Sequence, residues 1–279
     1  MYSIKSTRAK MINKNIIILG SKGMLGNQVL SYFKKKKYLI KTFDKRFKKS
    51  NVNSCIKSLN KERSSIIINC IGKIKQKKST FSELFWSNTI LINKFVELLN
   101  NKHLLIHPST DCVFNGENRF GYKKNARLDA LDDYGLSKAL AEKALKKRTN
   151  TLIIRTSIVG LEKKGKKALL GWFLSQKKTV YGYTDHFWNG VTTLKWCEFL
   201  EAFLSHKKNM NFKKTKIIQI GTKKKYSKYQ LLNIFKNIFG KKILIIKKKA
   251  GYANRYLKSD FKIDNFNKQI KSLKEFNEL

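Results

Sequence analysis

The 279-residue sequence has a single proline, only 18 acidic residues and no apolar run that approaches the roughly 18 residues of a membrane-spanning helix. Its four cysteines form no C-x-x-C pair, and its four histidines do not lie at metal-ligand spacing from them. We therefore expect free thiols, no bound metal, no membrane partner and a cytoplasmic location. With 42% hydrophobic and 12% aromatic residues, the chain can bury a core, which excludes disorder over most of its length.

The shortage of acidic residues leaves a formal net charge of +43, because 61 residues are lysine or arginine. Such a charge suits a polyanionic partner: a nucleic acid, an anionic membrane or a phosphate-rich small molecule. However, nearly all of the excess is lysine, and asparagine and isoleucine are also abundant. A/T-rich codons encode these three amino acids, so a biased genome explains the charge without selection for a basic surface. We favour that explanation over a nucleic-acid partner.

Short apolar runs alternate with helical apolar spacing over the first 160 residues. We expect strands at 16–19, 39–43, 65–69, 104–106 and 152–154, and helices at 24–33, 81–99 and 134–145. The alternation predicts an α/β fold with a Rossmann-type doubly wound parallel sheet, in a dinucleotide-binding domain over residues 12–160.

The pattern is looser after residue 160. Strands are expected at 217–220 and 243–246, and helices at 191–204 and 229–239. We expect residues 161–279 to form a smaller, mixed substrate-binding lobe that partly returns to the sheet.

A glycine pattern, G-x-x-G-x-x-G, follows the first expected strand and opens the first expected helix. Glycines allow a tight turn and a close approach of the backbone to a pyrophosphate, which the amino end of the helix then binds. The expected cofactor contacts in this loop are Gly20, Lys22, Gly23, Met24, Leu25 and Gly26.

An acidic residue, Asp44, ends the second expected strand, 18 residues beyond Gly26. That position is typical of a carboxylate that binds the ribose 2′-hydroxyl of NAD. Lys45 and Arg46 follow, and either could instead bind the 2′-phosphate of NADP. The cofactor is therefore expected to be NADPH or NADH, with the preference open.

Tyr134 and Lys138 form a Y-x-x-x-K pair at the start of the helix after the fourth strand. Residues i and i+4 share one helix face, and an ammonium favours the phenolate, so we expect Lys138 to lower the pKa of Tyr134. Tyr134 could then exchange a proton with a carbonyl oxygen. Thr110 lies at the carboxyl end of the fourth strand, where it could bond the same oxygen.

In this order, the motifs resemble those of the extended short-chain dehydrogenase/reductase superfamily, and more narrowly the dTDP-4-dehydrorhamnose reductase family. The matching segments are 17–26 (IILGSKGMLG), 109–116 (STDCVFNG), 134–139 (YGLSKA) and 154–157 (IRTS). The S-T-D-x-V-F-x-G block is the most specific of them. The resemblance covers residues 15–160 well and is thinner beyond.

The resemblance implies catalytic roles for Thr110, Tyr134 and Lys138. It places Cys70, Ile71 and Gly72 on the adenosine side of the cofactor, although the family usually has small alanines after the preceding Asn69. The implied substrate-binding residues are Ser109, Asp111, Val113, Phe114, Trp172, Trp188, Asn189 and Arg255.

The implied activity is the NAD(P)H-dependent reduction of a nucleotide-activated 4-keto-6-deoxy sugar of the dTDP-4-dehydrorhamnose type, in dTDP-rhamnose and surface-polysaccharide biosynthesis. A nucleotide-sugar partner and a homodimer are compatible with it. Three alternatives stay open: a nucleotide-sugar epimerase, a reductase of another 4-keto sugar, and a non-catalytic protein that binds a dinucleotide or nucleic acid.

Overall fold

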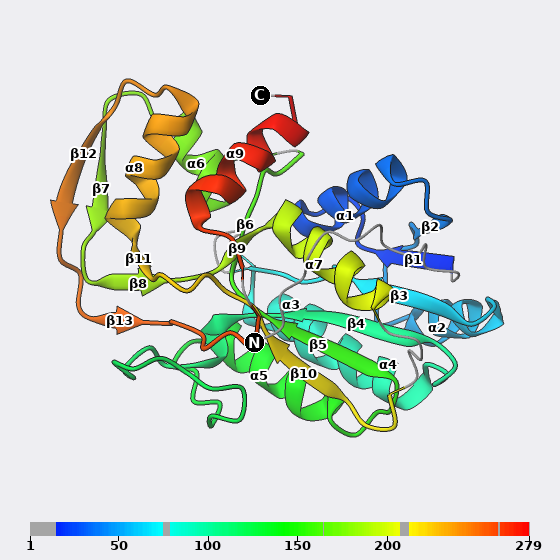
Figure 1. The fold of residues 1–279 in the computed structure, drawn as a ribbon. Helices are drawn as coiled ribbons and strands as arrows, with labels where there is room; N and C mark the ends of the chain where they lie inside the picture. Colours follow the sequence, from blue (N-terminus) through cyan, green and yellow to red (C-terminus); the bar gives the residue numbers. More distant parts are fainter. Residues whose placement is uncertain (1–14, 75–78, 164, 207–211, 262, 279) are drawn as a thin grey trace.

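The computed structural model describes residues 15–74, 79–163, 165–206, 212–261 and 263–278 (Figure 1). The first three residues of the expected dinucleotide-binding domain, 12–14, lie outside the described residues. Within the described chain, no helix is both long enough and apolar enough to cross a membrane.

A six-stranded parallel sheet forms the centre of the fold. Its strand order is β10-β5-β4-β3-β1-β2, built from β1 (Asn15–Leu19), β2 (Ile40–Phe43), β3 (Ser65–Asn69), β4 (Leu104–Ser109), β5 (Thr151–Arg155) and β10 (Lys216–Gln219). The chain leaves β1 toward β2 on one side and later returns to β3 on the other. Such a reversal is where open α/β sheets bind ligands, beyond the carboxyl ends of the strands. The predicted Rossmann-type fold is confirmed.

Successive side chains of the strands enter opposite layers, because side chains alternate along a β-strand. Ile16 and Ile18 pack in a large core with α1 (Met24–Lys35) and α7 (Thr193–Ser205). Ile17 and Leu19 pack in a second core with α2 (Val52–Lys61), α4 (Leu91–Leu98) and α5 (Asp133–Leu145). Burial on both faces explains why these strands consist of continuous apolar runs.

The predicted helix at 81–99 is present but is not uniform. It contains α3 (Phe81–Phe85), the π-helical turn η2 (Trp86–Ile90) and α4, and Thr80 forms a capping box with Glu83 at its start. Asn88, in the π turn, donates through Nδ2 to the backbone oxygen of Lys73 and to Ser137 Oγ on α5. The π turn thus joins the loop after β3 to the helix that carries Tyr134 and Lys138.

The residues after 160 contribute to both parts of the molecule. The strand β10 and the helix α7 belong to the central sheet and its cover. The remaining elements gather at one side in Figure 1: α6 (Leu169–Ser175), β7 (Thr179–Tyr183), α8 (Lys228–Phe239), β12 (Leu244–Lys248) and α9 (Phe266–Phe276). The division at residue 160 stays a prediction.

Short strands connect the two parts. One small sheet has the order β11-β8-β13, from β11 (Tyr226–Ser227), β8 (His186–Trp188) and β13 (Ala253–Asn254), and β6 (Ile158–Val159) pairs with β9 (Val191–Thr192). The expected helix at 191–204 begins two residues later, because Thr192 caps α7 by accepting a hydrogen bond from Lys195 N. The helices α2, α6 and α9 were not predicted.

Candidate active site

The loop between β1 and α1 has the geometry of a diphosphate cradle. Gly20 has a φ of +75°, which favours glycine, and a Cβ at Gly26 would lie 2.1 Å from the Gly20 carbonyl oxygen. At the start of α1, Gly23 provides no side-chain cap, and no acidic residue lies in the first turn. The backbone N–H groups of that turn can therefore bind an anion, so the loop fits a dinucleotide diphosphate.

A hollow of about 740 Å³ opens beside this loop. Six of the predicted cofactor residues line it: Gly20, Lys22, Asp44, Lys45, Ile71 and Gly72. Gly23, Met24, Leu25, Gly26 and Cys70 are not among the lining residues, and Leu25 packs in the core. Sequence reasoning missed other lining residues, which include Phe43, Phe47, Lys48, Lys49, Lys73, Glu83 and Trp86.

The hollow is strongly basic at its rim. Lys22, Lys45, Arg46, Lys48, Lys49 and Lys73 line it, against the two carboxylates of Asp44 and Glu83. Glu83 is paired with Lys73 at 2.9 Å, and Thr42 Oγ1 donates to Asp44 Oδ2 at 3.2 Å. This charge balance suits a ligand that carries several phosphates.

The predicted catalytic residues come from two elements at the carboxyl edge of the sheet. Thr110 follows β4 and caps the short 3₁₀ turn η3 (Asp111–Val113), and Tyr134 and Lys138 lie in the first turns of α5. Asp132 positions α5 by accepting a hydrogen bond from Gly135 N at 2.7 Å. The half-buried Tyr134 side chain interacts with the hydroxyl of Thr110. The structure therefore brings these two residues together.

The electrostatics of Tyr134 differ from the expectation. Burial raises its pKa above the ordinary value, Cys112 and Asp111 raise it further, and the hydrogen bond with Thr110 lowers it. Lys138 is not among the five largest influences on this pKa. The expected lowering of the Tyr134 pKa by Lys138 is therefore wrong for this structure, because burial dominates.

Lys138 itself is buried and bonded away from Tyr134. Its Nζ lies 3.0 Å from His107 Nε2 and donates to the Pro108 carbonyl oxygen at 2.8 Å. Burial lowers the pKa of Lys138 to about 8, and the nearby Glu142 opposes that effect. Sequence reasoning assigned no role to His107, since a single histidine within a buried strand carries no motif.

A buried ion pair lies one turn further along α5. Glu142 and Arg155 are at most 1% exposed, and Arg155 donates to Glu142 through Nη2 at 2.5 Å and through Nε at 3.0 Å. Ser109, predicted to bind substrate, donates instead to Glu142 Oε1 at 2.5 Å. This network links β4, β5 and α5, so it holds Thr110 in place relative to the helix that carries Tyr134.

The S-T-D block ends in a small cluster around Asp111. Burial raises the pKa of Asp111, while Arg255 and the bond from Thr110 lower it. Burial also raises the pKa of Cys112, to about 12. Arg255 donates through Nε to the Phe114 carbonyl oxygen at 3.3 Å, so the structure places this predicted substrate-binding residue beside the S-T-D block.

Several other predicted substrate residues are committed to packing. Val113 and Phe114 are fully buried, and the ring of Phe114 stacks on Tyr122 with centroids 4.1 Å apart. Asn189 is 2% exposed and donates to the carbonyl oxygens of Thr222 and Leu257. The burial of these three side chains does not support direct contact with a substrate.

The two predicted tryptophans lie apart from the S-T-D block in the sequence and on different elements. Trp188 on β8 packs edge-on against Phe266 of α9, with centroids 4.9 Å apart. Trp172 on α6 is half-buried, and Lys228 Nζ lies 5.4 Å from the centroid of its ring. Both tryptophans are half-buried and pack against the same large hydrophobic core.

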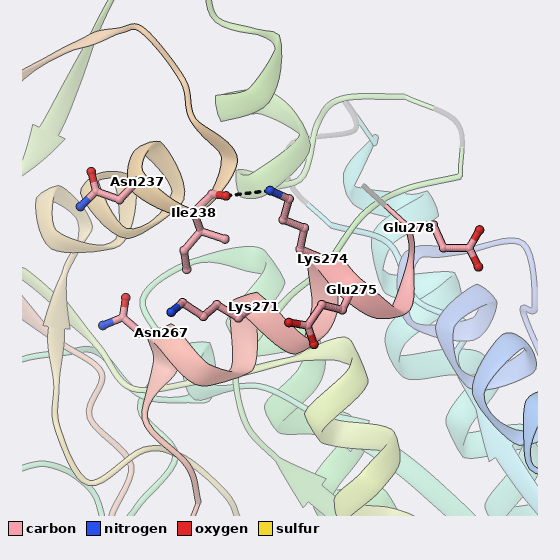
Figure 2. A pocket seen from close by; sticks show the side chains of 7 residues that line it. All are labelled: Asn237, Ile238, Asn267, Lys271, Lys274, Glu275 and Glu278. Carbon is pink, nitrogen blue, oxygen red and sulfur yellow. Dashed lines mark hydrogen bonds between the residues drawn. The ribbon is translucent and has the colours of Figure 1, made fainter.

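A second hollow, of about 880 Å³, lies between α8 and α9 (Figure 2). Its lining is polar, and Lys274 closes one side by donating to the Ile238 carbonyl oxygen at 3.0 Å. None of the predicted site residues lines it. Among the residues that the structure describes, no group of three His, Cys, Asp or Glu side chains could hold a metal ion.

Fold and motifs together define a Rossmann-type protein with an S-T-D block and a Y-x-x-x-K helix. A family model described as RmlD substrate binding domain matches residues 14–237, and the chain belongs to this family. The resemblance to the extended short-chain dehydrogenase/reductases is thereby confirmed. A comparison with curated protein sequences finds no match.

Solved structures share the fold at low sequence identity. A dTDP-4-dehydrorhamnose reductase from Bacillus anthracis, in complex with NADP, has a TM-score of 0.80 at 18% identity, over 97% of this chain and 100% of that chain. One from Clostridium acetobutylicum has a TM-score of 0.75 at 13% identity, over 95% and 100%. A dTDP-glucose 4,6-dehydratase from Bacillus anthracis, in complex with NAD, has a TM-score of 0.74 at 17% identity, over 95% and 96%.

Proposed function

We propose that the protein is an NADPH- or NADH-dependent reductase of a nucleotide-activated 4-keto-6-deoxy sugar, of the dTDP-4-dehydrorhamnose type. The observation that carries the proposal is the placement of Thr110 against Tyr134 on α5, which Asn88 ties to the wall of the basic hollow. Family membership and the cofactors named for the related structures support it. We further propose a cytoplasmic role in dTDP-rhamnose and polysaccharide biosynthesis.

The cofactor would lie along the glycine loop with its adenosine half in the hollow near Asp44 and Ile71. When bound, it would supply the hydride for the C4 carbon of the sugar. The N–H groups at the start of α1 would hold the diphosphate of the cofactor. The lysines at the rim of the hollow would attract the cofactor and the nucleotide sugar, since both are anions.

Tyr134 would act as the acid. Its raised pKa keeps the phenol protonated at neutral pH, so the O–H proton is available for the ketone oxygen as negative charge develops there. Thr110, whose hydroxyl lies near Tyr134 and donates to Asp111 Oδ1 at 3.1 Å, would turn its proton to the same ketone oxygen. The proton leaves Tyr134 and returns to it from solvent after product release.

The test is turnover with dTDP-4-dehydro-6-deoxy-L-mannose, followed by the absorbance of NADPH. One NADPH should be consumed for each sugar reduced, and Tyr134→Phe should lower kcat by about 10²-fold or more, because it removes the acid. Tyr181→Phe is the matched control, because the Tyr181 ring on β7 is exposed, and this variant should retain activity. Wild-type turnover by Tyr134→Phe would refute the role of the phenol.

Two further outcomes would favour the alternatives. Conversion of a nucleotide sugar with no net NADPH consumption indicates an epimerase. Tight binding of duplex DNA that weakens with salt, by a slope of about −0.9 for each phosphate contacted, together with no turnover, indicates a nucleic-acid-binding protein.

A further inference from the structure

A buried chain of three polar side chains runs behind the candidate active site. Asn69, at the end of β3, places Nδ2 at 3.3 Å from His107 Nδ1 on β4, and His107 Nε2 lies 3.0 Å from Lys138 Nζ on α5. The three residues are 1%, 1% and 6% exposed. Buried polar groups must be paired donor to acceptor, so the position of each proton in this chain can be derived.

The backbone sets the direction of the chain. The N–H of Ile71 donates to Asn69 Oδ1 at 3.2 Å, which turns the NH₂ group of Asn69 toward His107. His107 Nδ1 must then accept a hydrogen bond. Since a neutral imidazole has one donor and one acceptor nitrogen, the proton of His107 lies on Nε2, facing Lys138.

An ammonium group cannot satisfy that arrangement. It has three donors and no lone pair, so the Nε2–H of His107 would face a second donor. A neutral amine accepts from Nε2–H and still donates to the Pro108 carbonyl oxygen at 2.8 Å. The hydrogen-bond pattern therefore requires the uncharged form of Lys138.

We propose that Asn69 and His107 are positioning residues that favour the neutral amine form of the Lys138 side chain over its ammonium form. The proposal rests on the proposed function in taking Lys138 as a catalytic residue, the role that the family resemblance implies for it. Lys138 can gain a proton when its surroundings favour charge, but His107 must then move its own proton from Nε2 to Nδ1. That change turns a donor toward the NH₂ group of Asn69, so protonation of Lys138 is opposed.

The charged groups around Asn69, His107 and Lys138 are consistent with a preference of Lys138 for the amine form. Glu142 on α5 favours the ammonium form of Lys138, but Arg155 and Ser109 already bond its carboxylate. Burial works in the other direction: it lowers the pKa of Lys138 to about 8 and that of His107 well below its usual range, where the nearby Lys138 lowers it further. His107 is therefore a neutral imidazole at neutral pH rather than an imidazolium.

The tautomer of His107 can be read directly. The protein has only four histidines, so long-range ¹H–¹⁵N NMR of histidine-labelled protein resolves the signals of each ring. The signals that disappear in His107→Gln belong to His107. We expect a protonated Nε2 and an unprotonated Nδ1 for His107 in the wild type at pH 9, where the amine form of Lys138 predominates. The opposite tautomer, with Nε2 unprotonated, would overturn the proposal.

Variants of Asn69 test the cause. Asn69→Asp replaces the donor by an acceptor, so the His107 proton should move to Nδ1 and Lys138 should become an ammonium. Asn69→Ala removes the donor without adding charge and should shift the tautomer in the same direction. Cys70→Ser changes the next side chain at the same strand end and should leave the tautomer as in the wild type. A tautomer unaffected by both Asn69 variants would refute the assigned role.

The functional readout is the pH dependence of NADPH affinity, measured by the fluorescence of the bound dinucleotide. A catalytic Lys138 would lie beside the bound dinucleotide, so its ionisation should appear as a step in NADPH affinity against pH. In Asn69→Asp the midpoint of that step should move up by about one pH unit, because the mismatched donor pair is gone. An unchanged midpoint would overturn the coupling. Absence of sugar reduction would instead remove the proposed function, and the NMR result would stand independently of it.

Discussion

Replacing Lys138 by methionine should change the stability of the protein in opposite directions at low and high pH. Burial lowers the pKa of Lys138 from 10.5 to about 8 in the folded state, and the side chain is only 6% exposed. That difference corresponds to about 3 kcal/mol of destabilisation below pH 8, where the folded and the unfolded chain both carry the ammonium form. Methionine has a similar length and no charge to desolvate.

The sign follows from proton binding. Between pH 8 and 10.5 the unfolded state holds more protons at Lys138 than the folded state, so wild-type stability rises with pH over this window. Below pH 8 the desolvation of the Lys138 ammonium destabilises the wild type by its full amount. Methionine cannot bond His107 Nε2 or the Pro108 oxygen, which costs about 1 kcal/mol for each lost bond. Lys138→Met should therefore be the more stable protein at pH 7 and the less stable one near pH 10.5.

Urea unfolding of both proteins across this pH range provides the measurement. All other titratable groups are common to the two chains, so their contributions cancel in the difference between the unfolding free energies. Lys143→Met, an exposed lysine on the same helix, is the control and should show no such crossover. A difference between wild type and Lys138→Met that stays constant with pH would refute the reasoning.

Three further predictions concern the loop, the ion pair and the cofactor. Gly26→Ala should weaken NADPH binding at least tenfold and lower Tm, because its Cβ would lie 2.1 Å from the Gly20 carbonyl oxygen. In Gly23→Ala the Cβ would lie at an ordinary contact distance of 3.4 Å from the same oxygen, so its Tm should stay at the wild-type value. Equal Tm values for the two variants would contradict this explanation. Glu142→Gln should destabilise the fold by about 3–5 kcal/mol in urea unfolding, since Arg155 stays buried without its partner, and full wild-type stability would exclude that account. Arg46→Ala should raise KM for NADPH more than for NADH, because Arg46 lines the hollow beside Asp44; an equal change in both would place the 2′-phosphate elsewhere.

Much of the fold could be predicted from local patterns. The expected strand at 65–69 coincides with β3, and the expected helix at 134–145 differs from α5 by one residue, because strands buried on both faces and long helices leave strong apolar signals. The helix α2 was not predicted, because its four apolar positions lie among many polar residues. These positions are Val52, Cys55, Ile56 and Leu59. The π turn at Trp86–Ile90 leaves no signal in the apolar spacing of the helix around it.

The candidate site divides in the same way. The glycine loop and the Y-x-x-x-K helix were visible in the sequence, since each is a local motif with a local geometric reason. The partners of their side chains were not. Lys138 meets His107 from 31 positions away, and Ser109 meets Glu142 from 33 positions away, so neither pairing has a sequence signature.

The sequence by itself determined which strands and helices form and where the chemical groups lie along the chain, because backbone propensity and apolar periodicity act over a few residues. Only the tertiary structure decided the charge states of those groups. Desolvation and hydrogen-bond partners come from segments distant in the sequence, and here burial raises the pKa of Tyr134, which the sequence predicted to be lowered.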